Sequence, residues 1–352
     1  MKVLVLPGDG IGEDVANSAA DVLREITPDI ELDYALIGGC AYDATGTPLP
    51  DETIDKVKKA DAVLMGAVGG AKWDKLDYNL KPEAGLLKIR SHMKVFANLR
   101  PIKVFKPLLD SSPLKRDIID GIDLIIVREL TGGIYFGTPR GIEQRNDVYT
   151  GYNTLVYTVP EIERVARIAF SLAEKRDMRL TSVDKANVLE SSKLWRDTVD
   201  KIADDYPNVE VNHIYVDNCA MQLIRDPRQF DVILTQNLFG DILSDEASMI
   251  AGSLGMLPSG SIGDGPGLYE PVHGSAPDIS GTDAANPIGA IMSAAMMLRY
   301  SFDMKGNADQ IECAIDRVLS RGIRTPDIAF GAKEIVGTKK MTEYIIDEIG
   351  EV

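Results

Sequence analysis

Histidine, cysteine and basic residues are scarce in this chain of 352 residues. It has three His and three Cys. It has 38 Lys and Arg and 54 Asp and Glu, which gives a formal net charge of −16. The cysteines, Cys40, Cys219 and Cys313, are far apart and form no CxxC pair, which argues against a disulfide framework and favours a reducing compartment. The deficit of basic residues argues against nucleic acid or anionic membrane as the main partner, because both require a basic face.

Long apolar runs are also missing. The N-terminal segment MKVLVLPGDG has only five apolar residues before a proline and glycines, too few for the apolar region of a signal peptide. The most apolar later stretch, IGAIMSAAMML at 288–298, suits a buried helix and is too short to span a membrane. We therefore expect a cytoplasmic protein.

Short apolar runs alternate with helical patterns along the chain, and the length suggests about two domains. Strands are predicted at 2–7, 60–68, 123–129, 178–185, 209–217 and 230–237. Helices are predicted at 13–26, 160–176, 187–206, 218–225 and 240–254. This repetition predicts an α/β protein with a largely parallel sheet. The glycine-dense stretch 260–281 is expected to be a long functional loop.

The segment LPGDGIGEDV lies between a predicted strand and a predicted helix, where a dinucleotide-binding motif would lie. Its residues do not fit that motif. The GxGxxG pattern fails because Glu13 occupies the place of the third glycine. Asp9, Glu13 and Asp14 would also crowd negative charge beside a pyrophosphate. We predict a tight strand-to-helix turn here.

The segment NLFGDILSDE (237–246) places Asp241 and Asp245 one helical turn apart, where like charges repel. One interpretation is that the helix begins near Gly240, so that its dipole stabilises acidic residues in the first turn. The other is that the two carboxylates share a divalent cation. These ten residues alone leave both interpretations open.

Eight segments, in this order and spacing, resemble the β-decarboxylating dehydrogenase family: LPGDGIG, PEAGLLKIR, FANLRP, RELTGGIYFG, DKANV, YVDNCAMQL, NLFGDILSDE and EPVHGSAPDISG. The resemblance runs from Met1 to the last helix. It implies an α/β isopropylmalate-dehydrogenase-like two-domain fold with a large, mostly parallel mixed sheet, which is not a Rossmann fold. One domain would comprise 1–99 and 252–352 with the cofactor loops. The other, 100–251, would carry the substrate and metal residues, the dimer interface and an intersubunit arm near 140–157.

The resemblance also implies roles for the charged residues of these segments. Arg90, Arg100 and Arg128 would bind the substrate's carboxylates, since the guanidinium fork matches a carboxylate and stays charged. Asp217, Asp241 and Asp245 would hold Mg²⁺ or Mn²⁺, which prefer oxygen ligands, with Asp217 also touching substrate. Lys185 would be the general base and Tyr135 the proton donor. Asp217 and Lys185 would come from the second subunit of a homodimer with shared active sites.

The remaining assignments concern substrate and cofactor choice. Leu86, Leu87 and Val188 would contact a branched alkyl group, unless Leu86 and Leu87 are simply core residues. Asp278 would accept hydrogen bonds from a ribose 2′-hydroxyl and repel a 2′-phosphate, which favours NAD over NADP. Cofactor contacts are expected from Gly70, Glu83, Asn187, Glu270, His273, Gly274, Ser275, Ala276, Pro277, Asp278 and Asn286.

The implied activity is NAD-dependent oxidative decarboxylation of 3-isopropylmalate to 4-methyl-2-oxopentanoate and CO₂ in leucine biosynthesis. The same chemistry on isocitrate, homoisocitrate, tartrate or another 2-hydroxy diacid is an alternative. A non-catalytic regulatory paralogue is a second alternative, but such a chain would be expected to have lost part of this set of charged residues. All of them are present.

Overall fold

The computed structural model describes residues 1–350, which divide into two compact units. The first unit contains 1–95, 103–121 and the described residues from 248 on, and the second contains 96–102 and 122–247. The sequence predicts domain boundaries between residues 99 and 100 and between 251 and 252. In the structure the corresponding boundaries between the two units lie between 95 and 96 and between 247 and 248. Residues 103–121 belong to the first unit.

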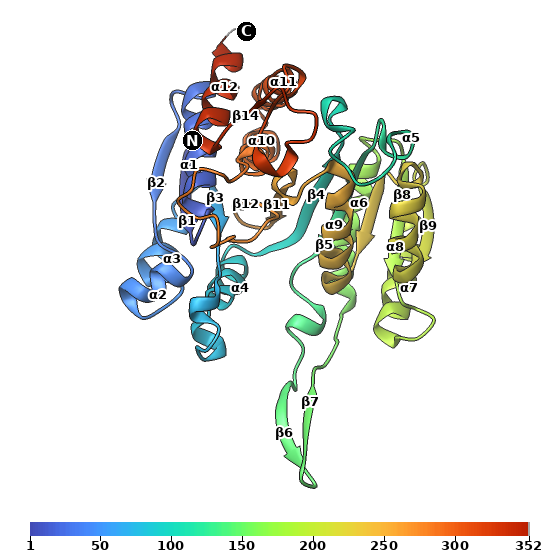
Figure 1. The fold of residues 1–352 in the computed structure, drawn as a ribbon. Coiled ribbons are helices and arrows are strands. Elements are labelled where there is room, and N and C mark those ends of the chain that lie inside the picture. The colour runs from blue at the N-terminus through green and yellow to red at the C-terminus, as the bar shows by residue number, and fades with distance from the viewer. Residues whose placement is uncertain (351–352) are drawn as a thin grey trace. The chain divides into compact units, whose positions relative to one another are not determined.

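In the first unit the strands follow the order β2-β1-β3-β12-β11 (Figure 1). Their bounds are β2 (Glu31–Tyr34), β1 (Lys2–Gly8), β3 (Ala62–Ala67), β12 (Gly267–Pro271) and β11 (Pro258–Gly263). All neighbours pair in parallel except β11 and β12, which are antiparallel. The sheet is therefore mixed, as predicted.

Four long helices complete the core of the first unit: α1 (Gly12–Ile26), α10 (Ile288–Tyr300), α11 (Lys305–Ser320) and α12 (Thr338–Gly350). α10 packs against α1, α11, β11 and β12, and every residue from Ile288 to Leu298 is buried. The prediction of a buried helix at 288–298 is confirmed. No helix among the described residues 1–350 is long and apolar enough to cross a membrane.

The predicted loop at 260–281 is wrong over its first half, because this half forms most of the β11–β12 hairpin. The ring of Tyr269 explains two of the glycines there, Gly260 and Gly267. A Cβ atom at Gly260 or Gly267 would come within 2.8 or 2.7 Å of that ring. Glycine content at these positions thus reflects packing around a buried aromatic side chain and not loop flexibility.

The predicted turn between β1 and α1 is confirmed, and it is closely packed. A Cβ atom at Gly8 would lie 1.9 Å from the Ala67 carbonyl oxygen, and one at Gly10 would lie 2.0 Å from that of Ser275. Both glycines have positive φ, at 76° and 59°. The buried carboxylate of Asp9 accepts backbone hydrogen bonds from Gly39 (2.8 Å), Cys40 (2.7 Å) and Gly69 (2.8 Å). The turn therefore ties together three segments of the first unit.

In the second unit β5 (Asp123–Glu129), β10 (Val232–Thr235), β8 (Arg179–Asp184) and β9 (Glu210–Tyr215) are parallel neighbours in this order. β4 (Val95–Lys103) precedes β5 in the strand order and is shared with the first unit. The helices are α6 (Val159–Ala173), α7 (Glu190–Ala203), α8 (Val216–Arg225) and α9 (Asn237–Ala251). Each strand and helix that was predicted in this unit is present, with ends that differ by a few residues.

Smaller elements complete the described chain: α2 (Gly39–Thr45), α3 (Asp51–Val57), α4 (Pro82–His92), α5 (Arg116–Ile119), β13 (Ile323–Arg324) and β14 (Glu334–Ile335). β6 (Gly141–Arg145) and β7 (Val148–Tyr152) form a separate two-stranded ribbon (Figure 1). Ile142, Val148 and Tyr149 of this ribbon are 79%, 63% and 77% exposed. An isolated two-stranded hairpin of this kind is only marginally stable in water on its own.

Candidate active site

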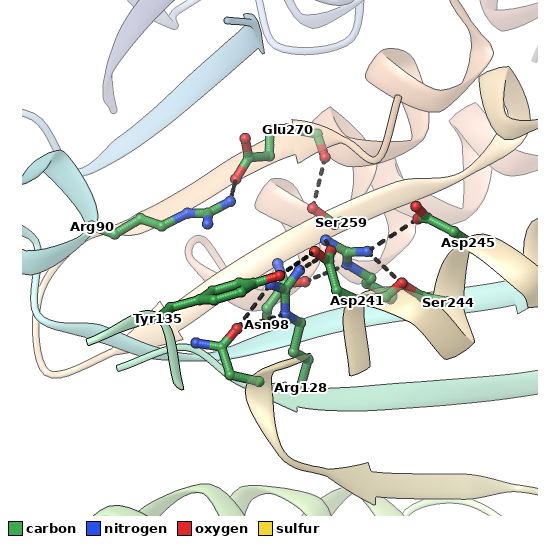
Figure 2. A network of polar contacts seen from close by, with 11 residues as sticks. Arg90, Asn98, Arg128, Tyr135, Asp241, Ser244, Asp245, Ser259 and Glu270 are labelled. Atoms are coloured by element: carbon green, nitrogen blue, oxygen red, sulfur yellow. Dashed lines mark hydrogen bonds and ion pairs between the residues drawn. The ribbon is translucent and has the colours of Figure 1, made fainter. Parts of the chain in front are cut away.

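Arg128 lies at the end of β5, beside the end of β10 and the start of α9. The parallel register pairs Arg128 with Thr235, and α9 begins two residues later at Asn237. Arg128 is buried, and its Nε and Nη2 donate to Asn237 Oδ1 at 3.1 and 2.8 Å. Its Nη1 pairs with Asp241. Figure 2 shows the Arg128 guanidinium group beside Asp241. A strand end and a helix start thus bring a buried cation to a carboxylate.

A second buried arginine reaches the same helix face from β4. Arg100 donates from Nε to Asn98 Oδ1 at 2.7 Å and from Nη1 to Ser244 Oγ (Figure 2). Its guanidinium lies 3.4 Å from Asp241 and 3.7 Å from Asp245. The two aspartates on α9 are therefore within reach of arginine charge in the second unit.

The structure contradicts one of the two interpretations of the aspartate pair, the one that relies on the helix dipole. α9 begins at Asn237 and not near Gly240, so Asp241 lies outside the first turn and the helix-dipole interpretation is wrong. The helix starts earlier because the Asn237 backbone N–H donates to the Tyr157 hydroxyl at 2.9 Å. Burial raises the pKa of Asp245, the charge of Asp241 raises it further, and Arg100 opposes both effects. A cation bound nearby would stabilise the charged form of such a carboxyl group.

Tyr135 faces this cluster from a short 3₁₀ helix, Gly133–Tyr135, after β5. Its hydroxyl donates to Asp241 Oδ2 at 3.1 Å, and its ring centroid lies 5.9 Å from the Arg128 guanidinium carbon (Figure 2). Burial raises the pKa of Tyr135, and the charge of Asp241 raises it further. The phenol is thus kept protonated, as a proton donor must be.

The loop that carries Tyr135 is anchored by Tyr157 and Glu129. A Cβ atom at Gly132 or Gly133 would lie 2.7 or 2.6 Å from the Tyr157 side chain. Glu129 is fully buried and accepts backbone hydrogen bonds from Thr131 (2.6 Å) and Gly132 (2.8 Å). Burial raises the pKa of Glu129, against the effect of these hydrogen bonds.

This raised pKa predicts a pH-dependent contribution to stability. The folded state holds the Glu129 proton more tightly than the unfolded state, so the resulting stabilisation is complete below the unfolded pKa. It is lost as pH rises through the folded pKa. In urea unfolding at a series of pH values, the free energy of unfolding of the wild type minus that of Glu129→Gln should fall as pH rises above about 4.5. The exposed Glu163→Gln on α6 serves as the control. A pH-independent difference for Glu129→Gln would contradict the prediction.

Lys185 and Asp217 form a separate pair in the second unit. Lys185 follows β8, Asp217 lies in the first turn of α8, and the Nζ–Oδ1 distance is 2.6 Å. Asp184, which is fully buried, accepts from the Ala186 backbone N–H at 2.9 Å and pairs with Arg196. Within residues 1–350 of one chain, no three His, Cys, Asp or Glu side chains gather at a potential metal site. The three predicted metal ligands therefore do not meet within the described part of a single chain.

In the first unit, α4 displays Arg90 together with the two leucines. Arg90 Nη2 donates to Glu270 Oε1 at 2.6 Å (Figure 2). Leu86 and Leu87 are half-buried, whereas Ile89 on the same helix is fully buried. The two leucines are thus less buried than Ile89 of the same helix. In the first turn of α4, on the same face as Leu87 and Arg90, Glu83 lies close to Gly69, where an added Cβ would be 2.9 Å from Glu83 Oε1.

The loop from His273 to Asp278 is held against the turn between β1 and α1. The Ser275 carbonyl accepts from the Ile11 N–H at 2.8 Å, and Ser275 Oγ donates to the Gly69 carbonyl at 2.8 Å. Asp278 is exposed. Asn286 is buried and donates to Asp327 at 3.0 Å. Its Oδ1 accepts at 3.0 Å from the N–H of Ile288, the first residue of α10. The predicted loop residues 273–278 and Gly70 thus belong to segments tied to one buried turn.

Two further predicted residues, Asn187 and Val188, directly follow the Lys185 segment. Asn187 and Val188 are exposed on the loop that follows Lys185, Val188 at 65%. The sequence reasoning missed Asn98, Asn237 and Ser244, which position the arginines. Asn98 lies two residues before Arg100 on one strand, and Ser244 lies three residues after Asp241 on one helix. These same-face spacings were the available signal.

Comparison with known proteins gives matches over the whole chain. The model of the family described as isocitrate/isopropylmalate dehydrogenase matches residues 2–345. The 3-isopropylmalate dehydrogenases of Synechocystis sp. and Aquifex aeolicus are each 54% identical, covering 100% and 99% of this chain and 99% and 97% of their own lengths. The crystal structure of isocitrate dehydrogenase from Methylococcus capsulatus has a TM-score of 0.88 at 33% identity and covers 99% of each chain. A β-decarboxylating dehydrogenase from Thermococcus kodakarensis has a TM-score of 0.81 at 36% identity, covering 99% of this chain and 96% of its own.

Proposed function

Because this chain belongs to the isocitrate/isopropylmalate dehydrogenase family, we propose that it oxidises and decarboxylates 3-isopropylmalate to 4-methyl-2-oxopentanoate and CO₂, with NAD, in leucine biosynthesis. The chain is an oxidoreductase of the β-decarboxylating class. The observation that carries the choice of substrate is the pair of half-buried leucines on the helix of Arg90. A third substrate carboxylate, as in isocitrate, would meet apolar side chains there and remain unpaired at a large cost.

Arg90, Arg100 and Arg128 are assigned to the substrate's carboxylates. Arg100 and Arg128 are buried and each is oriented by a neutral side-chain acceptor, Asn98 and Asn237 respectively. Guanidinium groups that are fixed before the substrate arrives lose little conformational entropy on binding. Their positive charge also favours a dianionic substrate over neutral analogues.

The carboxylates of Asp241 and Asp245 fit a hard divalent cation, since the donor set consists of oxygen atoms alone. Asp217, from a second copy of the chain, would complete the set. When bound, Mg²⁺ or Mn²⁺ would polarise the C2 hydroxyl and stabilise the negative charge that develops as CO₂ leaves. Lys185 of the partner copy accepts the proton of the C2 hydroxyl, and Tyr135 protonates C3 after decarboxylation.

The loop His273–Asp278 fits the adenosine part of NAD. His273 Nδ1 lies 2.9 Å from the Gly274 carbonyl oxygen, which can only accept, so Nδ1 carries the proton. Burial lowers the pKa of His273 and keeps the ring neutral. Nε2 is then a buried acceptor without a hydrogen-bond partner among the described residues, suited to an amino or hydroxyl donor of a nucleotide. The exposed carboxylate of Asp278 favours a ribose 2′-hydroxyl over a 2′-phosphate. The other predicted contacts, including Glu83, Asn187 and Glu270, remain assigned to NAD.

A homodimer with shared active sites is part of the proposal, and so is a cytoplasmic location. Apolar side chains support the dimer: Met221 and Ile224 on α8 and Ile242 on α9 are 62%, 37% and 56% exposed. The ribbon β6–β7 adds its own exposed apolar face. The free thiols of Cys40, Cys219 and Cys313 agree with a reducing compartment.

The ribbon provides a test of the dimer. Ile142→Asp and Tyr149→Asp are expected to raise the dimer dissociation constant by about 10- to 100-fold, because each would bury a charge in an apolar interface. Sedimentation velocity over a concentration series measures this change. Gln144→Asp, also exposed on the ribbon, is the charge-matched control and should have a smaller effect. Unchanged association of both ribbon variants would show that the ribbon is not an intersubunit arm.

The proposed activity is tested by NADH or NADPH formation with Mg²⁺ and 3-isopropylmalate, isocitrate, homoisocitrate or tartrate, each with NAD and with NADP. The expected result is a strong preference for 3-isopropylmalate with NAD. Preference for a tricarboxylate would refute the role of the leucines and retain the family chemistry. Absence of turnover with all four substrates would favour a non-catalytic paralogue.

A further inference from the structure

Asn237 connects three parts of the second unit through one buried side chain and its backbone. Its Oδ1 accepts from Nε and Nη2 of Arg128, at 3.1 and 2.8 Å. Its Nδ2 donates to the Gly132 carbonyl at 3.3 Å, and its backbone N–H donates to the Tyr157 hydroxyl at 2.9 Å. Asn237 is 2% exposed, so water does not replace these contacts without rearrangement.

An amide is suited to this position for two reasons. A carboxylate of the same shape cannot donate to the Gly132 carbonyl, and an aliphatic side chain can neither donate nor accept. The amide oxygen is also neutral. It orients the Arg128 guanidinium without adding a second negative charge beside Asp241, which already pairs with Arg128. The amide therefore adds no neutralisation of the Arg128 charge beyond that by Asp241.

The Gly132 contact extends this effect to the proton donor. Gly132 belongs to the loop that leads directly into the 3₁₀ helix of Tyr135, and the Tyr157 ring packs against the same loop. One side chain thus fixes both a buried cation and the start of the loop that carries the phenol. Neither contact depends on the first unit.

We propose that Asn237 is a positioning residue that sets the substrate-carboxylate affinity of Arg128 and the placement of Tyr135 together, through the neutrality and the two-sided hydrogen bonding of its amide. This inference rests on the proposed function for the identity of the anion. It assigns to Asn237 no contact with the substrate.

The test compares Asn237→Asp with Tyr157→Phe and with the control Asn208→Asp, which makes the same change at an exposed site of this unit. Binding of 3-isopropylmalate and isocitrate with Mg²⁺ and without nucleotide is measured by calorimetry, and kcat and KM are measured with NAD. Asn237→Asp is expected to raise the dissociation constant and KM by about 10- to 100-fold, because the added carboxylate beside Arg128 repels an anionic substrate. It should also lower kcat, because the Gly132 contact is lost.

Thermal unfolding separates this role from a merely structural one. Tyr157→Phe removes the hydroxyl that accepts from α9 and leaves the Arg128–Asn237 contact, so it should lower the melting temperature with little change in binding. If both variants weaken binding in proportion to their loss of stability, the inference is overturned. The inference would also be overturned if Asn237→Asp bound both acids with wild-type affinity, or if the wild type bound neither acid. Wild-type binding without turnover would refute the proposed function alone.

Discussion

Lys185→Met is expected to lower kcat with 3-isopropylmalate by about 10²- to 10⁴-fold, the usual contribution of a positioned general base. The methionine side chain has a similar length but cannot accept a proton. KM should change much less, because the arginines retain their contacts. The measurement is steady-state NADH formation at saturating substrate, with dimer formation confirmed for the variant.

Two comparisons make this expectation specific. Lys193→Met removes an exposed lysine on α7 that pairs with Glu190, and it should leave kcat near the wild-type value. Tyr135→Phe should also lower kcat, and Asp241 would lose the hydrogen bond from the phenol. Turnover of Lys185→Met close to the wild type would show that another group removes the hydroxyl proton.

Asp9→Ala is expected to lower the free energy of unfolding by roughly 3–5 kcal/mol, the largest stability effect predicted for this chain. The substitution leaves the backbone N–H groups of Gly39, Cys40 and Gly69 without their shared acceptor in a buried place. It also removes a carboxylate from the start of α2, where the helix dipole favours negative charge.

Urea unfolding measures this difference, and the neighbouring Glu13→Ala is the control because Glu13 is exposed in the same segment. Glu13→Ala should change stability by less than about 0.5 kcal/mol. An Asp9→Ala variant within about 1 kcal/mol of the wild type would mean that water satisfies the freed N–H groups.

Local pattern was sufficient for much of the fold. The continuous apolar runs of β3 and β5 identify buried parallel strands, and β1, β8 and β10 are also present where strands are predicted. The predicted fold class is confirmed. Glycines misled the prediction at 260–271, because their spacing carries no information about the Tyr269 ring against which they pack.

The charged residues of the candidate site could be named from their motifs, but their contacts could not. Arg100 and Arg128 meet Asp241 because strands distant along the chain end beside the same helix, and α9 starts where the Tyr157 hydroxyl accepts its first N–H. The roles of Asn237 and Ser244 as acceptors follow from the same long-range contacts, whereas Asn98 accepts from Arg100 two residues away on the same strand.

Sequence periodicity reports which residues of one segment share a face, since a helix or strand repeats over a few residues. Hydrophobic burial follows that period, so elements and core were readable directly from the chain. Hydrogen-bond partners depend instead on atoms brought within about 3 Å from segments far apart in sequence, a distance that only packing can set. Local pattern thus determined the alternation of strands and helices. Only the packing of distant segments brought the Asn237 amide to Arg128 and the Ser244 hydroxyl to Arg100.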